Sequence, residues 1–405
     1  MRIWVVNHYA DPPDGLATRS FDLAHRWVEK GHPATIFVCN FGHYDMKQMR
    51  EIPPLRLWLD EDIEGVRMVW LRAPGYSRNN WRRVLNMVVF SMLAVIAGVF
   101  RRERPDVVIG VSVHPLAALA GWFLARIKRA RFFFEVTDLW PQTLIEFGML
   151  SPTSLAARSM QRLERFLFRH SERIIMLWRH TDEYVESRGV PRDRIVWIPH
   201  GVELSRYESL GTYDGVASKP FRVMFLGGFV SANSLETILD AAAELKKRGR
   251  DDIRLLLIGS GQDRDAIIER AQTLGLDNVE FPAAVPKAEI SRAMAGADAF
   301  IYGLRDLPLY RYGISLNKLT DYLAAGRPIV FFGRSTYDPV AEARAGFSVP
   351  PGDPVAVARA IEQLSVLSPQ ERKEMGQRGR DYLLNHHNIP NLAEKFLRVL
   401  ETAPA

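Results

Sequence analysis

The stretch FRVMFLGGFVSANSLETILDAA (221–242), followed by IRLLLIGSG (253–261), decides the fold. Each of the two segments begins with an apolar run broken by a single arginine, reaches a glycine turn and then leads into a helical pattern. Continuous apolar runs separated by helices are typical of parallel strands whose sheet is covered on both faces. This part of the chain is therefore predicted to form βαβ units of a doubly wound α/β sheet.

The same alternation continues on both sides of this stretch. Downstream it includes NVEFPAAV (278–285), AFIYGL (299–304) and PIVFFG (328–333). Upstream it includes RIWVVN (2–7), TIFVCN (35–40), VRMVWLR (66–72), DVVIGVS (106–112), RFFFEVTD (131–138), RIIML (173–177) and IVWIPHGV (195–202).

Polar and turn residues interrupt the pattern at 203–220. A chain of 405 residues is also too long for one hydrophobic core. We therefore predict two Rossmann-like doubly wound parallel-sheet domains, 1–202 and 221–387, joined by a linker at 203–220.

Composition is that of an ordinary globular protein, with 47% hydrophobic and 25% charged residues. The single cysteine, Cys39, excludes an intramolecular disulfide and fits a reducing compartment. The start of the chain has no signal-peptide pattern, so a cytoplasmic location is expected. A formal net charge of +6 fits either nucleic acid or an anionic membrane surface as a partner.

An apolar run, VLNMVVFSMLAVIAGVF (84–100), follows Arg78, Arg82 and Arg83. The run approaches the length of a membrane span, yet a strand pattern begins directly after it. A spanning helix, a plain core helix and a core helix that also touches the bilayer remain open as interpretations.

Ligands of doubly wound sheets bind at the carboxyl ends of the strands. After the first strand, Gly15 would let the backbone approach a ligand closely, although an ordinary turn explains it equally. Asp138 ends a very apolar strand, so its carboxylate must be solvated, hydrogen-bonded or at a site. A helix cap is the alternative for Asp138.

In the second domain, glycine turns lead into helix N-termini, which attract phosphate groups. These glycines are Gly227, Gly228, Gly259 and Gly261. Neither turn has the dinucleotide fingerprint, which argues against a nicotinamide enzyme. The chain also lacks a P-loop lysine motif, which argues against a nucleoside-triphosphate hydrolase.

The segment YGISLNKLTDYLAAGRPIVFF (312–332) predicts a helix that carries Asn317, Lys318 and Asp321 on one face. Lys318 and the amides after Ser315 can neutralise a diphosphate, and Asp321 can accept hydrogen bonds from ribose hydroxyls. Together with the glycine turns, this predicts a nucleoside-diphosphate pocket. No His, Cys or carboxylate spacing predicts a catalytic metal.

Several of these segments resemble the retaining glycosyltransferases of family 4. They are the glycine loop and helix NHYADPPDGLATRSFDLAHRWVEKGHPATIF (7–37), EVTDLWPQTLIEFGML (135–150), IPHGVE (198–203), the base-binding segments LLLIGSGQDRDAI (255–267) and NVEFPAAVPKAEISRAMAGADAFIYGL (278–304), and YGISLNKLTDYLAAGRPI (312–329). The last is similar to the branch that includes bacterial N-acetylfucosamine transferases of O-antigen and capsule assembly. The resemblance implies the GT-B fold, in which two Rossmann-like domains face each other across a cleft and a C-terminal helix, here about 388–405, packs back on the first domain.

The resemblance also implies a metal-independent transfer, without a cofactor, from a UDP-linked sugar to a lipid-linked (polyprenyl-diphosphate) saccharide in cell-surface polysaccharide synthesis. The transferred group would be a hexosyl or N-acetylaminosugar unit. Gly15 and Asp138 would act at the transferred sugar, and Lys318 at the leaving diphosphate. The enzyme would sit peripherally on the inner face of the plasma membrane, with Arg78, Arg82 and Arg83 on the acceptor and membrane side and no role for nucleic acid. The implied donor-binding residues are Gly227, Gly228, Asn233, Gly259, Gly261, Val285, Ser315, Leu316, Asn317, Lys318 and Asp321.

The sequence departs from the family pattern at three places. Gly313 stands where many members have the first of two donor-site carboxylates, and Thr137 replaces a histidine. The loop GGFVSANSLE (227–236) lacks the Arg and Lys that grip the diphosphate in many members, so Lys318 and backbone amides are expected to do more. The alternatives are an inactive scaffold, a basic nucleic-acid binder and a non-hydrolysing sugar-nucleotide 2-epimerase.

Overall fold

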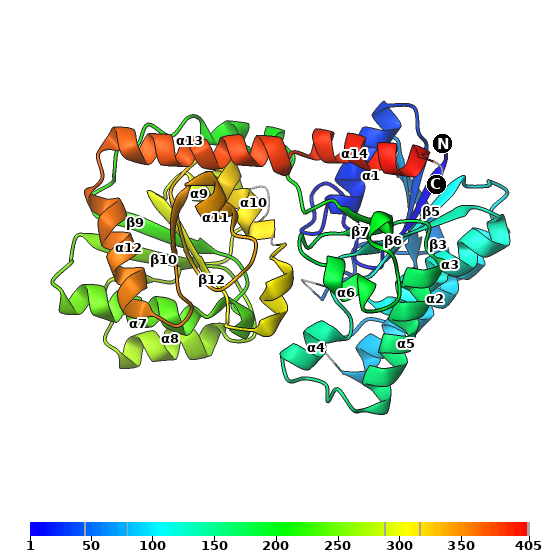
Figure 1. Ribbon diagram of the computed structural model, residues 1–405, viewed down its shortest axis with the longest axis horizontal. Coiled ribbons are helices and arrows are strands. Elements are labelled where there is room, and N and C mark those ends of the chain that lie inside the picture. Colours follow the sequence, from blue (N-terminus) through cyan, green and yellow to red (C-terminus); the bar gives the residue numbers. More distant parts are fainter. Residues whose placement is uncertain (44–45, 79, 287–288, 316, 403–405) are drawn as a thin grey trace. The chain divides into compact units, whose positions relative to one another are not determined.

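The computed structural model describes residues 1–405 apart from 44–45, 79, 287–288, 316 and 403–405. The chain forms two compact units, one of residues 1–199 with 389–405 and the other of residues 200–388. In each unit, helices cover both faces of a mainly parallel sheet (Figure 1). This is the doubly wound architecture that the apolar runs predict.

The first unit contains an eight-stranded sheet in the order β3-β4-β2-β1-β5-β6-β7-β8. All neighbouring pairs are parallel except β3 with β4, which form an antiparallel hairpin at the edge. The sequence analysis missed β3 because its residues, WLDEDI, alternate in exposure and carry three carboxylates. The strands are β1 (Ile3–Val6), β2 (Ala34–Cys39), β3 (Trp58–Ile63), β4 (Val66–Leu71), β5 (Val107–Val111), β6 (Arg131–Val136), β7 (Ile174–Met176) and β8 (Ile195–Trp197).

Helices α2 (Trp81–Phe100), α3 (Pro115–Lys128) and α5 (Leu155–His170) cover one face of this sheet, and α1 (Arg19–Glu29) and α14 (Ile389–Glu401) cover the other (Figure 1). The C-terminal helix α14 packs on α1: the Trp27 indole N–H donates to the Ala393 carbonyl at 3.2 Å, and its ring lies 5.2 Å from that of Phe396. Shorter helical segments are α4 (Gln142–Glu146), α6 (Asp182–Glu186) and η1 (Arg192–Arg194).

The second unit contains a six-stranded sheet in the order β11-β10-β9-β12-β13-β14, and all its strand pairs are parallel. The strands are β9 (Phe221–Leu226), β10 (Ile253–Ile258), β11 (Val279–Glu280), β12 (Ala299–Gly303), β13 (Ile329–Phe332) and β14 (Gly346–Val349). The helices are η2 (Leu204–Leu210), η3 (Ser231–Asn233), α7 (Leu235–Lys247), α8 (Arg264–Thr273), α9 (Ile290–Met294), η5 (Pro308–Tyr312), α10 (Asn317–Ala324), α11 (Pro339–Ala343), α12 (Pro354–Val366) and α13 (Pro369–His386).

The segment predicted as a linker, 203–220, is instead packed on the second unit. Tyr213 donates to the Asp298 carbonyl at 3.2 Å, and the Asp298 carboxylate accepts from the backbone N–H and hydroxyl of Ser218. Its polar composition suggested a linker, but Tyr213 and Ser218 have specific hydrogen-bond partners in the second unit.

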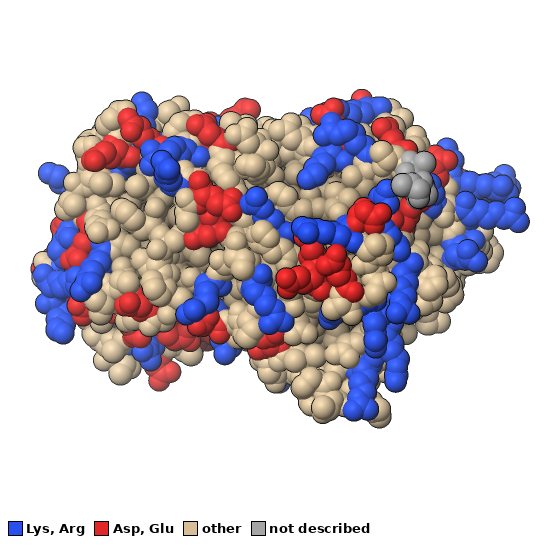
Figure 2. Space-filling model, viewed as in Figure 1, with Lys and Arg blue, Asp and Glu red and all other residues tan. Residues whose placement is uncertain are grey.

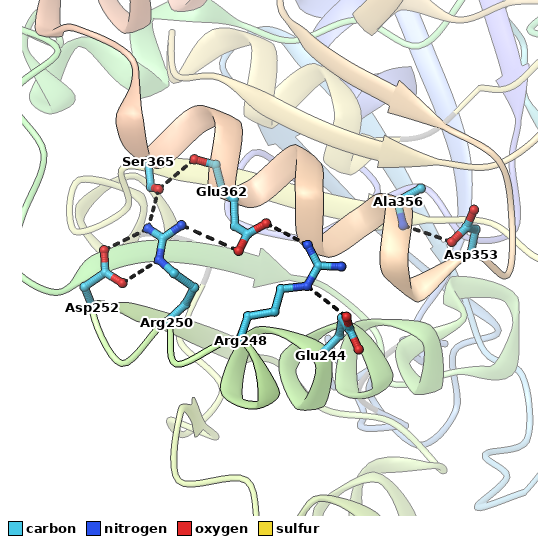
Figure 3. A network of polar contacts seen from close by, with 8 residues as sticks. All are labelled: Glu244, Arg248, Arg250, Asp252, Asp353, Ala356, Glu362 and Ser365. Atoms are coloured by element: carbon cyan, nitrogen blue, oxygen red, sulfur yellow. Dashed lines mark hydrogen bonds and ion pairs between the residues drawn. The ribbon is translucent and has the colours of Figure 1, made fainter.

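At the amino-end edge of the second sheet, an ion-pair network joins α7, β10 and α12 (Figure 3). Glu362 accepts from Arg248 at 2.9 Å, and Arg250 forms a two-pronged pair with Asp252 at 2.8 Å. These charged groups pair with one another, which indicates a structural role for this edge of the sheet. Ligands of such sheets bind at the opposite edge, where the strands have their carboxyl ends.

Candidate functional site

Gly15 lies in the loop that follows β1, at the carboxyl-end edge of the first sheet. The Asp11 carboxylate organises this loop by accepting from the backbone N–H groups of Leu16 and Ala17, both at 2.8 Å. A Cβ on Gly15 would lie 2.2 Å from the Asp11 Cβ. The loop itself therefore requires glycine here, and a direct role of the Gly15 backbone at a ligand stays a prediction.

Asp138 follows β6 at the same edge, and it does not cap a helix. Helix α4 has Pro141 at its N-cap and no side-chain cap bond. Within the described residues, no hydrogen bond or ion pair to the Asp138 carboxylate is found. Burial raises the pKa of Asp138 to about 6, although the Arg83 guanidinium opposes this rise. A partly buried carboxylate with a pKa this close to neutrality is typical of a functional site.

The backbone around Asp138 is held from two neighbouring elements. The Thr137 N–H donates to the Ser112 hydroxyl at 3.1 Å, and the Trp178 indole donates to the Thr137 carbonyl at 3.0 Å. Yet three buried polar atoms of this loop have no hydrogen-bond partner in the described part of the chain: Thr137 Oγ1, Trp140 Nε1 and Thr143 Oγ1. Buried polar atoms without partners are uncommon, so we expect bound water or a polar ligand to complete their hydrogen bonds.

Arg83 points inward from the first turn of α2 rather than outward with Arg78 and Arg82, which are exposed. Its Nε donates to the Tyr9 hydroxyl at 3.3 Å, and the Tyr9 ring stacks on His43 at 4.5 Å. The sequence analysis placed all three arginines on the acceptor and membrane side. Arg83 is half-buried, unlike the other two, and its predicted role at the acceptor stays a prediction. In the sequence, nothing distinguishes Arg83 from the exposed arginines Arg78 and Arg82 that precede it.

Three histidines lie in the same region of the first unit. His8 Nδ1 lies 2.6 Å from His114 Nε2, and His43 Nδ1 lies 2.6 Å from the Tyr76 hydroxyl. Burial lowers the pKa of His43 to about 4 and that of His114 to about 3. Both histidines are therefore uncharged at neutral pH.

Replacing Arg83 by glutamine should move the pKa of Asp138 upward, because the guanidinium charge that favours the carboxylate would be gone. The carboxyl carbon signal of Asp138, identified by its absence in Asp138→Asn, can be titrated by NMR. Arg82→Gln is the matched control, because it removes the same charge from the neighbouring residue, which is exposed. An unchanged Asp138 titration in Arg83→Gln would show that Arg83 does not govern this carboxylate.

In the second unit, four predicted donor-site residues come together at the loop after β9. The Lys318 ammonium donates to the Asn233 side-chain oxygen, and the Asn233 amide donates to the Gly228 carbonyl at 2.7 Å. A Cβ on Gly227 would lie 3.5 Å from Lys318 Cε and Nζ. Lys318 therefore lies directly against the glycine turn, as a diphosphate site requires.

Burial lowers the pKa of Lys318 to about 7. Its helix, α10, is held to β9 by Tyr322, whose hydroxyl donates to the Leu226 carbonyl at 3.1 Å and accepts from the Leu226 N–H at 2.8 Å. Lys318 and Tyr322 are four residues apart and so share a helix face. Tyr322 was not predicted, because only the fold shows that it fixes the helix that carries Lys318.

Gly259 and Gly261 have a packing role that explains their identity. Their φ angles are +149° and +153°, and a Cβ would lie 1.9 Å from the Gly227 carbonyl oxygen and 2.3 Å from that of Phe229, respectively. The loop after β10 thus crosses directly over the loop after β9. Contact of either glycine with a ligand stays a prediction.

The remaining predicted donor residues are placed as follows. Ser315, just before α10, has a buried hydroxyl without a hydrogen-bond partner among the described residues. Asn317 begins α10 and is exposed, and Val285 is half-buried in the loop after β11. Leu316 lies outside the described residues.

Asp321 has a partner that the sequence did not indicate. The Tyr207 hydroxyl of η2 donates to Asp321 Oδ1 at 2.6 Å. Asp321 is half-buried, so the contact ties the 204–210 segment to α10 at the proposed ribose position. The predicted role in ribose binding is compatible with this contact, because a carboxylate accepts several hydrogen bonds.

Within the described residues, no group of three His, Cys, Asp or Glu side chains is arranged to hold a metal ion. One helix in that part of the chain, α2, is long and apolar enough to cross a membrane, and a third of its most apolar window is buried. The buried side packs on α3: a Cβ on Gly98 would lie 2.4 Å from Leu124 Cδ2. Helix α2 therefore belongs to the α/β unit.

Two family models match the chain. The glycosyl transferase 4-like domain matches residues 14–201, and the glycosyl transferases group 1 model matches residues 220–367. Together they leave only 1–13, 202–219 and 368–405 unmatched.

Known proteins resemble the chain over most of its length. A probable glycosyltransferase, WbjE of Pseudomonas aeruginosa, is 23% identical over 79% of this chain and 82% of its own. A putative colanic acid biosynthesis glycosyl transferase, WcaI of Escherichia coli K12, is 21% identical over 68% of this chain and 69% of its own. The structure of Anabaena HepE in complex with UDP and glucose superposes with a TM-score of 0.69 at 13% identity, covering 100% of both chains.

The fold, the two matched domains and these relatives define the class of protein: the chain is a glycosyltransferase with the GT-B fold. More particularly, it belongs to the glycosyltransferases in which a glycosyl transferase 4-like domain precedes a group 1 domain.

Proposed function

We propose that the protein transfers a sugar from a UDP-linked donor to a lipid-linked saccharide during the synthesis of a cell-surface polysaccharide. The observation that carries this proposal is the arrangement of Lys318, Asn233 and the Gly227–Gly228 turn in the group 1 domain. The colanic acid relative supports a polysaccharide product, and the HepE complex supports UDP as the nucleotide. We also propose that the protein belongs to the branch that includes bacterial N-acetylfucosamine transferases.

We further propose that transfer retains the anomeric configuration and requires no metal. Lys318 and the amides at the start of α10 would stabilise the negative charge that develops on the departing diphosphate, the task that a metal ion performs in other enzymes. Asp138 would act at the transferred sugar. Activity in the presence of EDTA tests the metal part of this proposal.

The surface of α2 supports the proposed acceptor and location. Its solvent side presents apolar side chains at helical spacing, with Trp81 66% and Met92 59% exposed, and the Arg82 guanidinium lies over the Trp81 ring at 5.6 Å. An exposed apolar stripe next to arginines is typical of a helix at the membrane interface. We therefore propose that the enzyme is cytoplasmic and binds peripherally to the membrane that holds its lipid-linked acceptor.

A panel of nucleotide-sugars incubated with membrane-extracted lipid-linked acceptors tests the function. We expect release of UDP together with transfer of the labelled sugar into the lipid fraction. Conversion of the donor into its C2 epimer would instead identify an epimerase. Absence of UDP binding and of any turnover would identify an inactive scaffold.

Asp321→Asn should weaken UDP binding, because the carboxylate that accepts the ribose hydroxyls would be lost. Charge-assisted hydrogen bonds contribute about 1.5–3 kcal/mol each, so a loss on the order of tenfold or more is expected by calorimetry. The loss should vanish for 2′,3′-dideoxyuridine diphosphate, which has no ribose hydroxyls. If Asp321→Asn and Tyr207→Phe lower the melting temperature equally without a ligand-specific effect, the carboxylate serves only the contact with η2.

A further inference from the structure

Helix α5 carries four arginines on one face: Arg158, Arg162, Arg165 and Arg169. Their spacing of four, three and four residues places them on one side of the helix, and all four are exposed. In the described part of the chain, none of them forms an ion pair with a carboxylate. Figure 2 shows the resulting run of Lys and Arg side chains along the position of α5 in Figure 1.

Exposed apolar side chains adjoin this basic face. Leu155 begins α5 on the same side as the arginines and is 80% exposed, and Met149 in the preceding segment is 72% exposed. The neighbouring helix α3 adds Phe123 and Ile127, which are 45% and 53% exposed. The two helices are in contact, since the Trp122 ring of α3 lies 4.7 Å from the Phe166 ring of α5.

We propose that α5 and the segment before it form a second membrane-docking element, distinct from α2. Its four arginines would bind anionic lipid headgroups, while Met149 and Leu155 would enter the interface. The helices α2, α3 and α5 lie side by side on one face of the first sheet, so a single bilayer surface would contact all three. This proposal rests on the proposed function, because it names the surface through which the lipid-linked acceptor would be reached.

The connection to Asp138 gives this element its functional meaning. The loop that carries Asp138 continues through α4 (Gln142–Glu146) directly into Met149 and then α5. Docking of this segment would bring the carboxylate loop to the level of the headgroups, where the diphosphate and first sugars of a lipid-linked acceptor lie. A nucleic acid would also meet four arginines favourably, but it would gain nothing from exposed Met149 and Leu155, so the membrane is the occupant that the surface favours.

The test is flotation of the full chain with phosphatidylcholine vesicles that contain or lack phosphatidylglycerol. The α5 variant combines Arg158→Gln, Arg162→Gln, Arg165→Gln and Arg169→Gln. The control removes four exposed cations from the second unit through Lys219→Gln, Lys247→Gln, Arg292→Gln and Lys373→Gln. One basic residue near an anionic surface contributes about 1 kcal/mol, which corresponds to about fivefold in partitioning.

We expect the α5 variant to lose at least about tenfold in binding to anionic vesicles and the control to lose far less. Met149→Ser with Leu155→Ser should weaken the binding that persists at high salt, where charge attraction is screened. Equal loss in the α5 variant and the control, or no flotation of the wild type, would overturn the proposal. Preferential binding of a DNA or RNA oligonucleotide through the same arginines would do so as well.

The readout separates this proposal from the proposed function. UDP affinity, measured by calorimetry, should be the same in the wild type and in the α5 variant. A wild type that floats through α5 but binds no nucleotide would contradict the proposed function and leave the docking element standing.

Discussion

UDP binding should weaken at least about tenfold when Lys318 is replaced by methionine, and turnover should fall by about a hundredfold to a thousandfold. The Lys318 ammonium is held by the Asn233 side chain against the Gly227–Gly228 turn. Charge-assisted hydrogen bonds to a phosphate contribute about 1.5–3 kcal/mol each, which accounts for the binding loss. The larger effect on turnover is expected because charge on the diphosphate grows as the sugar departs.

The pH dependence of UDP binding gives this prediction a second readout. Burial lowers the pKa of Lys318 to about 7, so much of the free protein carries a neutral amine above that pH. A bound diphosphate favours the charged ammonium and raises its pKa again, so binding must take up a proton. We therefore expect UDP affinity to fall as the pH rises above about 7.

Calorimetry in buffers of different ionisation enthalpy measures this proton uptake. At pH 8 we expect uptake of close to one proton in the wild type and none attributable to this site in Lys318→Met. Lys247→Met, at an exposed position of α7, is the matched control and should bind UDP normally. If Lys318→Met weakened UDP and uridine equally, Lys318 would have no contact with the phosphates.

The fold was predictable because its main signal is local. Apolar runs such as those at 221–226 and 253–258, each with a single arginine, form parallel strands, and the turns after them hold the predicted site residues. Helix α10 begins at Asn317, and the left-handed Gly326 follows its end, as the sequence indicated. Lys318, Asn233 and the glycine turn meet in the structure because strand-end loops share one edge of the sheet.

Tertiary contacts explain what the sequence could not indicate. Arg83 lies in a run of exposed arginines, and only the fold shows that it turns toward Tyr9 and influences Asp138. The partner of Asp321 is Tyr207, which is 114 residues away in the sequence and lies in a segment that composition marked as a linker. No periodicity or motif in the sequence indicates such contacts, because they depend on which loops the sheet brings together.

The arginine face of α5 was missed for a different reason. Its spacing is visible in the sequence, but a charged face on a helix is usually only solvated. The structure adds the exposure of Leu155 and Met149 beside it and the shared layer with α2 and α3, and these observations turn a common pattern into a candidate surface.

Replacing Asp138 by asparagine should reduce sugar transfer by about a hundredfold to a thousandfold while UDP binding stays unchanged. The carboxylate accepts no hydrogen bond from the described residues and caps no helix, so none of these residues depends on its charge for a structural contact. Asparagine keeps the shape of the side chain and removes the charge. Product formation and calorimetry with UDP, measured on the same preparation, separate the two effects.

The stability of Asp138→Asn decides between a catalytic and a structural aspartate. Burial raises the pKa of Asp138 from 3.8 to about 6, so ionisation opposes folding, and the wild type loses stability as the pH rises from about 4 to about 6. Removing the charge should therefore leave stability unchanged at pH 4 and increase it above pH 6, by an amount on the order of 1–3 kcal/mol. A residue that lowers stability but is needed for turnover is typical of an active site. If Asp138→Asn instead melted at a lower temperature at pH 7 and also bound UDP more weakly, Asp138 would be a structural residue and the assignment to the transferred sugar would be wrong.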